Sequence, residues 1–530
     1  MNRKQIIISG AILAVLVGCV GPGTFGFGEK YDLIISGGRV LDGTGNPWYY
    51  ADIGIEDDEI EAIGDLSGAR ARRVIDATGL YVAPGFIDVH IHAGGSLSSA
   101  NRSSAQPLLA QGNTTVIVGP CGSGPVDIAA ERKNLLEDGL GVNTVQFIGH
   151  GSVRSAVMGS EDRDPTETEL EEMKALIRQG MEDGAFGMSS GPFYAPGSFS
   201  ETEELVELAK VVAEYGGVHE SHIRDESDYT IGLLAAVDEL IQVSREAKLP
   251  GIVSHIKALG PNVWGLSGAV VNRINRARQE GLEIYADQYP YDASSTGLSA
   301  ALLPRWAQAG GRNELQRRFE EPAEMARIRE AMVENLARRG GAGRIMFSSF
   351  GADTTIVGKT LEQVASERSL NHVDAAVELL RQGGPSIISF NMLEDDIRTF
   401  MVQDWTMTGS DGSLPRMNAG TPHPRSYGTF PRKIRKYVVE DGVLELQAAI
   451  RSMTSLPATA FKIPDRGILR EEAIADVVVF DLENLRDIAT FQQPHQLAEG
   501  MMYVIVNGEL AIDGGQFTGV LAGEVLKKDR

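Results

Sequence analysis

The stretch GFIDVHIHAGG, residues 85–95, places two histidines, His90 and His92, one residue apart at the end of an apolar run. The run predicts a buried strand, and side chains two residues apart on a strand point to the same face. Two neutral imidazoles side by side are suited to binding a divalent metal ion. Such a pair also occurs in strands that bind nothing, so a metal site requires further ligands elsewhere in the chain.

Strand-like segments alternate with amphipathic helical segments after this stretch. Residues 166–169 and 200–203 (TETE and SETE) each have the pattern of a capping box, which opens a helix. Repeated β–α units over this length predict a parallel (β/α)8 TIM-like barrel over residues 85–462. An open doubly wound sheet is the alternative, but no G-x-G-x-x-G motif follows a first strand. Seven further segments are predicted strands: TTVIVGPCG, NTVQFIGHG, GAFGMSSG, GGVHESHI, PGIVSHIKALG, LEIYADQYPY and WTMTGSDG.

Both ends of the chain differ from this barrel pattern. Residues 31–84 and 463–522 contain short alternating strands broken by glycine, which predicts a small β-sandwich domain built from both ends. Residues 296–345 form a charged helical stretch that interrupts the β–α rhythm, and we interpret it as an insertion. It is either a lid over the barrel mouth or a surface excursion. Between residues 340 and 405 the strand assignment stays open, because RIMFSSF and SIISFNM also have the pattern of strands.

Composition excludes one class of partner. The 530 residues are 42% hydrophobic and carry a formal net charge of −23. The chain is therefore globular, with ample material for a core. Nucleic-acid binding requires a concentrated basic surface, so the acidic balance argues against a nucleic-acid partner.

The first residues predict export. Basic residues 3 and 4 precede an apolar run over residues 6–17 that is too short to span a bilayer. The run ends in LVGC, which resembles a bacterial lipobox. We expect residues 1–18 to be a lipoprotein signal peptide, Cys19 to be lipidated, and residues 19–30 to be a tether, which makes the chain a bacterial cell-envelope lipoprotein. An ordinary signal peptide with an accidental cysteine is the alternative.

The barrel prediction brings six candidate metal ligands together. In a TIM barrel, functional groups lie at the carboxyl ends of the strands. Five of the predicted strands end in a histidine, a cysteine or an aspartate. The six candidates are His90 and His92 on the first strand, Cys121 on the second, His222 on the fifth, His255 on the sixth and Asp411 on the last.

Several motifs in order resemble the amidohydrolase superfamily, and within it the N-acyl-D-amino-acid deacylase (D-aminoacylase) group. The resemblance runs from about residue 31 to 515. Its motifs are PGFIDVHIH, GPCG, GHGSVR, SSGPFYAPG, SHIRDE, SHIKALG, YPYDASST, GSDG, HPRSYGTFPR, TSLPA, GILREEAIADVVVFD and VIVNG.

The resemblance implies a zinc centre. It assigns Cys121, His222 and His255 to one tightly held Zn²⁺, and His90, His92 and Asp411 to a second, weaker site. Many two-metal amidohydrolases bridge their ions with a carboxylated lysine. Here the three lysines between His92 and His222 all fall in predicted helices, so none can reach the barrel mouth. They are Lys133, Lys174 and Lys210.

Zinc with three protein ligands leaves a position for water and lowers the pKa of that water to roughly 7. The resulting hydroxide would attack an amide carbonyl, with Asp411 as general base; Asp287 is the competing candidate. Lys257 and Arg425 are expected to bind the substrate carboxylate. Tyr194, Tyr289 and Ser295 match family positions that hold the substrate.

These expectations lead to one hypothesis and two rivals. The hypothesis is a zinc-dependent hydrolase that cleaves the amide bond of N-acyl-D-amino acids, and its D-selectivity rests on the resemblance alone. One rival is a cyclic-amide hydrolase of the dihydropyrimidinase or hydantoinase kind, against which the missing lysine counts. The other is a catalytically silent, envelope-tethered binding protein. The sequence leaves the acyl group, the amino-acid side chain and the oligomeric state open.

Overall fold

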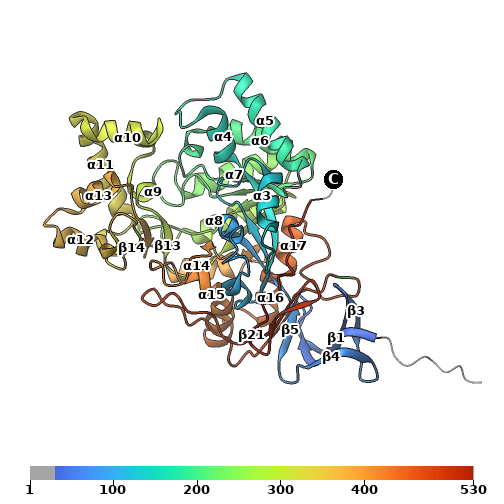
Figure 1. Ribbon diagram of the computed structural model, residues 1–530. Coiled ribbons are helices and arrows are strands. Elements are labelled where there is room, and N and C mark those ends of the chain that lie inside the picture. The colour runs from blue at the N-terminus through green and yellow to red at the C-terminus, as the bar shows by residue number, and fades with distance from the viewer. Residues whose placement is uncertain (1–29, 529–530) are drawn as a thin grey trace, which may run out of the picture.

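A computed structural model describes residues 30–528, so the expected signal peptide, Cys19 and most of the tether lie outside the described residues. The described chain is built around a barrel of parallel strands, as the β–α rhythm predicts (Figure 1). The seven segments predicted above all contain barrel strands. The barrel strands are β6 (Phe86–His92), β7 (Asn113–Val118), β8 (Asn143–Gly149), β9 (Gly187–Ser190), β10 (Val218–Ser221), β11 (Gly251–Val253), β12 (Ile284–Gln288), β16 (Thr406–Thr408) and β17 (Gly412–Ser413).

The last barrel strand is split in two, and this split closes the barrel. β16 pairs in parallel with β12, whereas β17 pairs in parallel with β6. The two halves are separated by residues 409–411, so Asp411 lies between the strands on either side of the seam. Because the chain leaves the extended conformation there, Asp411 is displaced from the regular alternation of a strand.

Helices pack around the barrel, and their apolar faces cover its strands. Thr166 and Glu169 form the predicted capping box at the start of α5. The second predicted box is wrong: α6 begins after Glu201, and the Ser200 hydroxyl donates instead to the Gly197 carbonyl at 2.7 Å. The helices around the barrel include α3 (Ile128–Leu136), α4 (His150–Met158), α5 (Glu167–Glu182), α6 (Thr202–Glu214), α7 (Leu233–Ala247), α8 (Ser267–Gln279), α14 (Glu394–Met401), α15 (Arg425–Arg432), α16 (Leu446–Met453) and α17 (Ser455–Phe461).

The two ends of the chain come together beside the barrel, as predicted, and their strands pair in one continuous sheet (Figure 1). The connection between them is the antiparallel pairing of β5 with β18, in which Val82 lies opposite Val479. Valine, isoleucine and leucine side chains from both ends form a common core there. The strands are β1 (Lys30–Val40), β2 (Tyr49–Glu56), β3 (Glu59–Gly64), β4 (Arg70–Asp76), β5 (Tyr81–Pro84), β18 (Val477–Phe480), β19 (Met501–Val506), β20 (Glu509–Asp513) and β21 (Gln516–Phe517).

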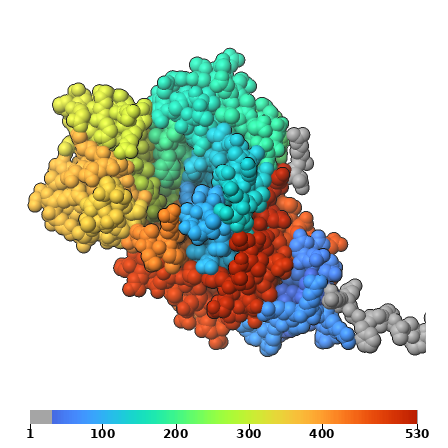
Figure 2. Space-filling view, in the orientation of Figure 1, coloured from blue at the N-terminus to red at the C-terminus, as the bar shows by residue number. Residues whose placement is uncertain are grey.

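Between β12 and β16 the chain forms a lobe with its own sheet and its own core. RIMFSSF and SIISFNM do form strands, but they pair in this lobe and not in the barrel. Figure 2 shows the lobe, coloured yellow to orange, at one side of the molecule. Among residues 30–528, no helix is long and apolar enough to cross a membrane. The lobe contains β13 (Ser294–Gly297), β14 (Ile345–Ser349), β15 (Ser386–Ser389), α9 (Leu298–Leu302), α10 (Gly311–Glu320), α11 (Pro322–Arg338), α12 (Leu361–Glu367) and α13 (His372–Arg381).

Candidate functional site

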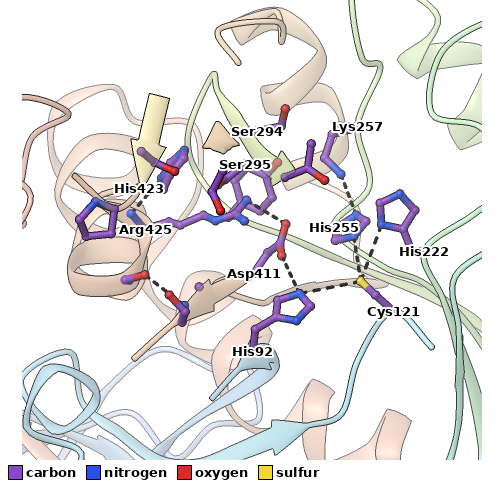
Figure 3. Close-up of a pocket in the computed structure, with 18 of the residues that line it drawn as sticks. His92, Cys121, His222, His255, Lys257, Ser294, Ser295, Asp411, His423 and Arg425 are labelled. Carbon is purple, nitrogen blue, oxygen red and sulfur yellow. Dashed lines mark hydrogen bonds and ion pairs between the residues drawn. The ribbon is translucent and has the colours of Figure 1, made fainter. Parts of the chain in front are cut away.

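The thiol of Cys121 lies among four imidazoles at the carboxyl ends of the barrel strands, and Figure 3 shows three of them, His92, His222 and His255. Its Sγ is 3.4 Å from His90 Nε2, 3.5 Å from His255 Nε2, 3.7 Å from His222 Nδ1 and 4.0 Å from His92 Nε2. These five side chains come from four different strands or the loops that directly follow them. The barrel therefore brings together residues that are far apart in the sequence, such as His90 and His255, which are separated by 165 positions.

Asp411 completes the cluster on the side of His92. Its Oδ1 is 3.4 Å from His92 Nε2 and 3.7 Å from His90 Nε2. Its other oxygen, Oδ2, forms an ion pair of 2.8 Å with Arg425 Nη1. Sequence reasoning placed Arg425 against the substrate and did not foresee that it also contacts Asp411.

The donor set and its spacing fit a transition-metal ion. Zinc has bonds of about 2.3 Å to sulfur and 2.0–2.1 Å to nitrogen in tetrahedral sites, which places sulfur and nitrogen ligands about 3.6 Å apart. The separations of Cys121 from His90, His222 and His255 all lie close to that value. Among residues 30–528 there are three groups of possible ligands whose atoms lie within 4.8 Å of one another inside each group: His90–Cys121–His255, His90–His92–Asp411 and His222–Glu226–His255.

The second of these sets is the predicted weaker site, whereas the predicted tight set is not among the three. Cys121 contacts both His222 and His255, but the compact set around its thiol contains His90 in place of His222. The division of the six ligands between a tight and a weak site therefore stays a prediction.

Two glutamates that sequence reasoning missed hold the histidine rings. Glu220 Oε1 is 2.9 Å from His90 Nδ1, and Glu226 Oε1 is 3.0 Å from His255 Nδ1. In both histidines the opposite nitrogen, Nε2, faces Cys121. A carboxylate on one ring nitrogen fixes the tautomer and the orientation of a metal-binding histidine and raises its basicity, as Glu220 does for His90. At His255 the same nitrogen also lies 2.7 Å from Lys257 Nζ, so Glu226 and Lys257 orient this ring together.

Both glutamates lie close to His222 in the sequence, but no local pattern reports their burial against the site. Glu220 is two residues before His222 on the fifth barrel strand, and Glu226 is four residues after it in the loop that leaves this strand. Both are almost completely buried, at 0% and 3% exposure. A buried carboxylate requires polar or cationic partners, and these two find them at the ligand histidines.

Burial sets the charge of two of the four histidine ligands. It lowers the pKa of His222 and of His255 well below the ordinary value, so these imidazoles are neutral near pH 7. Neutral imidazole is the form that binds metal. Burial alone would raise the pKa of Asp411, but the neighbouring Arg425 guanidinium and the histidines lower it well below the ordinary value. Asp411 is therefore an ionised acceptor.

Three of the candidate ligands have a left-handed backbone. The φ angle is 55° at Cys121, 34° at His255 and 46° at Asp411. A side chain disfavours this region by about 1–3 kcal/mol, and such residues cluster at functional sites. Each of the three lies just beyond a barrel strand or in a gap within one, where the reversal turns its side chain toward the barrel axis.

A cavity of about 410 Å³ opens over the ligand cluster and is lined by residues of the barrel and of the lobe. All five predicted substrate-binding residues line it. They are Lys257, Arg425, Tyr194, Tyr289 and Ser295.

Several of these residues already have partners. Lys257 Nζ lies 2.5 Å from Glu226 Oε1 and 2.7 Å from His255 Nδ1. The Ser295 hydroxyl donates to the Ile387 carbonyl at 3.0 Å. The Lys257 charge is therefore largely compensated by Glu226, and Ser295 offers the cavity only the acceptor capacity of its hydroxyl.

Arg339 is a third cation of the cavity, and sequence reasoning missed it. It follows α11 in the lobe, is 1% exposed and lines the cavity. Its Nε donates to the Tyr229 hydroxyl at 2.9 Å, but its buried Nη1 has no hydrogen-bond partner. Among the described residues no carboxylate forms an ion pair with it, so it provides uncompensated positive charge.

Asp287, the competing base, lies beneath the ligands and does not line the cavity. Its Oδ1 accepts a hydrogen bond of 2.9 Å from the His255 backbone N–H. Burial raises its pKa to about 7. The three lysines between His92 and His222 lie in α3, α5 and α6, as expected, and none of them lines the cavity.

The comparisons with known proteins agree with this geometry. The amidohydrolase family model matches residues 73–512. N-acyl-D-glutamate deacylase from Alcaligenes xylosoxydans xylosoxydans is 36% identical over 502 residues, 91% of this chain and 93% of that protein. A solved structure of D-aminoacylase, studied for its binuclear metal center, is 32% identical and has a TM-score of 0.80, covering 94% of this chain and all of that one.

A second solved structure is that of N-acyl-D-glutamate deacylase from Bordetella bronchiseptica, complexed with zinc and a phosphonate inhibitor that mimics the tetrahedral intermediate. It is 34% identical, with a TM-score of 0.80 over 94% of this chain and all of that one. The family match covers most of the sequence, and both solved structures share the fold of this chain over 94% of its length. This chain belongs to the amidohydrolase family.

Proposed function

We propose that this chain is a zinc-dependent hydrolase that cleaves the amide bond of N-acyl-D-amino acids to give a carboxylate and a free D-amino acid. The observation that carries the proposal is the position of the Cys121 thiol, 3.4–4.0 Å from four imidazoles at the barrel mouth. The likeness to N-acyl-D-glutamate deacylase and D-aminoacylase supports the substrate class and the D configuration.

In this proposal Cys121, His222 and His255 hold one zinc ion tightly, and His90, His92 and Asp411 form a weaker second site. The chemistry that zinc supplies when bound is Lewis acidity, which polarises an amide carbonyl and lowers the pKa of water to roughly 7. Glu220 and Glu226 keep the rings of His90 and His255 oriented toward the thiol.

Asp411 is the general base. Its Oδ1 faces the ligand cluster, and Arg425 on its Oδ2 keeps it ionised, so it can accept a proton from the attacking water. Asp411 then passes this proton to the amide nitrogen as the C–N bond breaks. The water's oxygen ends in the new carboxylate, and the water proton that Asp411 transfers ends on the free amine.

The cavity cations bind the substrate carboxylate. Arg425 and Lys257 face the cavity beside the ligand cluster, and Arg339 adds a guanidinium without a carboxylate partner. A substrate carboxylate balances the remaining positive charge, because among residues 30–528 only two carboxylates, Glu226 and Asp411, line the cavity with these three cations. Tyr194 and Tyr289 close the cavity around the substrate.

A substrate panel tests the proposal against both rivals. Zinc-loaded protein is assayed with N-acetyl derivatives of D- and L-amino acids and with hydantoins and dihydrouracil. We expect release of free D-amino acids, with the L-series at least about 100-fold slower. Ring opening of the cyclic amides without cleavage of the linear ones would support a cyclic-amide hydrolase, and no turnover of any compound would support a binding protein.

We also propose that the chain is exported and held at the bacterial cell envelope by lipid on Cys19. The support is the sequence of residues 1–19, with its basic start, apolar run and LVGC ending. Replacement of Cys19 by Ala is expected to release the protein from the membrane fraction. Unchanged fractionation of the Cys19→Ala variant would contradict the anchor.

A further inference from the structure

A second cavity of about 690 Å³ adjoins the cavity described above. The two cavities share His92, Cys121 and Tyr194, so the ligand cluster lies at the boundary between them. The second cavity is lined by the loop that follows β7, the first turns of α4 and the loop that follows β9. A substrate whose amide lies at the ligand cluster therefore has room to extend in two directions.

The two cavities differ in charge. The first contains Lys257, Arg339 and Arg425, whereas no described lysine, arginine, aspartate or glutamate lines the second. A carboxylate buried without a cation is strongly disfavoured. The amino-acid half of the substrate, which carries the carboxylate, is therefore expected in the first cavity, and this leaves the second cavity for the acyl half.

The floor of the second cavity is backbone and small side chains. Gly122 and Gly191 are buried where the loops after β7 and β9 meet, and a Cβ added to Gly191 would lie 2.3 Å from the Cys121 carbonyl oxygen. At the far end, Ser155 and Ala156 of α4 are exposed. Beyond His92 and Tyr194, which it shares with the first cavity, this cavity is a trough lined mostly by glycine, serine and alanine that runs from the ligand cluster to the surface of α4.

We propose that this trough binds the acyl chain of the substrate and that the preferred substrates carry an extended aliphatic acyl group of six or more carbons. The inference rests on the proposed function, because it assumes that an N-acyl amide is cleaved at the ligand cluster. Because the trough opens to solvent at Ser155 and Ala156, acyl chains longer than six carbons can extend out of it.

The size of the preference follows from burial of methylene groups. A fully buried methylene contributes about 0.8 kcal/mol, which is about a fourfold gain in affinity for each group. A chain in an open trough keeps one side in water, so about a twofold gain for each methylene is expected. Four added methylenes, from acetyl to hexanoyl, should then raise kcat/KM about tenfold or more.

A matched pair of variants tests the trough. Ala156→Phe places a ring at its open end, and Ala129→Phe makes the same change at an exposed position of α3 that does not line either cavity. Kinetics are measured with N-acetyl, N-hexanoyl and N-decanoyl derivatives of one D-amino acid. Calorimetric titration of the zinc-loaded protein with acetate and decanoate gives a binding readout that does not depend on turnover.

We expect Ala156→Phe to reduce kcat/KM for the decanoyl substrate at least tenfold, to weaken decanoate binding similarly, and to change the acetyl substrate less than twofold. Ala129→Phe should match the wild-type protein throughout. Hydrolysis of all three substrates at equal rates, or equal losses for acetyl and decanoyl substrates in Ala156→Phe, would overturn the trough but leave the proposed function intact. No hydrolysis of any substrate would overturn both.

Discussion

Glu220 lies 2.9 Å from the Nδ1 atom of His90, and both side chains are completely buried. The Ser254 hydroxyl donates to the carboxylate oxygen that contacts His90, and this hydrogen bond holds Glu220 in position against the ring. Glu220 does not touch the thiol or the cavity. Its contact is therefore a positioning contact, and it predicts a specific effect on metal binding.

Glu220→Gln should weaken zinc binding about 10–100-fold, because the amide no longer polarises the His90 ring as a carboxylate does. Competition with a chelator measures the change. Glu239→Gln is the matched control, since Glu239 is also a buried glutamate but pairs with Arg224 away from the ligands. Equal zinc affinities in the two variants would remove Glu220 from the metal site.

Asp411→Asn should abolish turnover while the protein keeps its tightly bound zinc. Loss of a general base typically reduces the rate by about 10²–10⁴-fold. Elemental analysis of the purified variant, together with its kcat, separates the two effects. Wild-type rates would exclude Asp411 as the base, and loss of all zinc would make it a ligand of the tight site.

Cys121→Gly should give a more stable metal-free protein than Cys121→Ala. The φ angle of 55° at this position disfavours any side chain, whereas glycine adopts it freely, so the two variants should differ by about 1 kcal/mol in the free energy of unfolding. Both variants lack the thiol, so their difference isolates the backbone. Denaturant unfolding in the presence of a chelator measures it, and equal stabilities would show that the site stores no backbone strain.

Lys433→Met should stabilise the protein more at pH 6.5 than at pH 9.5. Lys433 is buried under the last barrel strand, where it donates to the Thr408 and Ser452 hydroxyls at 2.9 and 2.8 Å. Burial lowers its pKa to about 7, against about 10.4 in the unfolded chain.

Between these two pKa values the unfolded chain binds the extra proton, so this lysine makes stability rise with pH from about 7 to about 10. Below pH 7 the folded protein carries the full penalty of a buried charge, which methionine removes. Thermal unfolding of both proteins at the two pH values checks this. A stability difference that does not shrink at pH 9.5 would mean that Lys433 titrates normally.

Much of the fold could be predicted because the sequence shows both the alternation of strands with helices and the polar residues at the strand ends. The alternation of strands and helices predicts the barrel, and barrel geometry then places His90, Cys121, His255 and Asp411 at one rim. The strands of the lobe illustrate the limit. β14 and β15 have the same local pattern as barrel strands. Only their pairing, of β14 with β15 and of β15 with β13, separates them from the barrel.

The candidate metal ligands could be predicted from the sequence, but the residues that surround them could not. Ligands were found because few residue types bind zinc, whereas Glu220, Glu226 and Arg339 act through distance and burial, which no local pattern reports. Arg339 belongs to a lobe that the sequence indicated only as a charged insertion. Its approach to the cavity depends on how that lobe packs against the barrel.

X-ray absorption at the zinc edge tests the central claim most directly. With Cys19 replaced by Ala, Cys121 is the only thiol of the chain. Protein loaded with one equivalent of zinc should show one sulfur neighbour at about 2.3 Å and nitrogen or oxygen neighbours at about 2.0–2.1 Å, and the sulfur should disappear when Cys121 is also replaced by Ala. A spectrum with nitrogen and oxygen alone in the Cys121-containing protein would contradict a zinc centre built on this thiol.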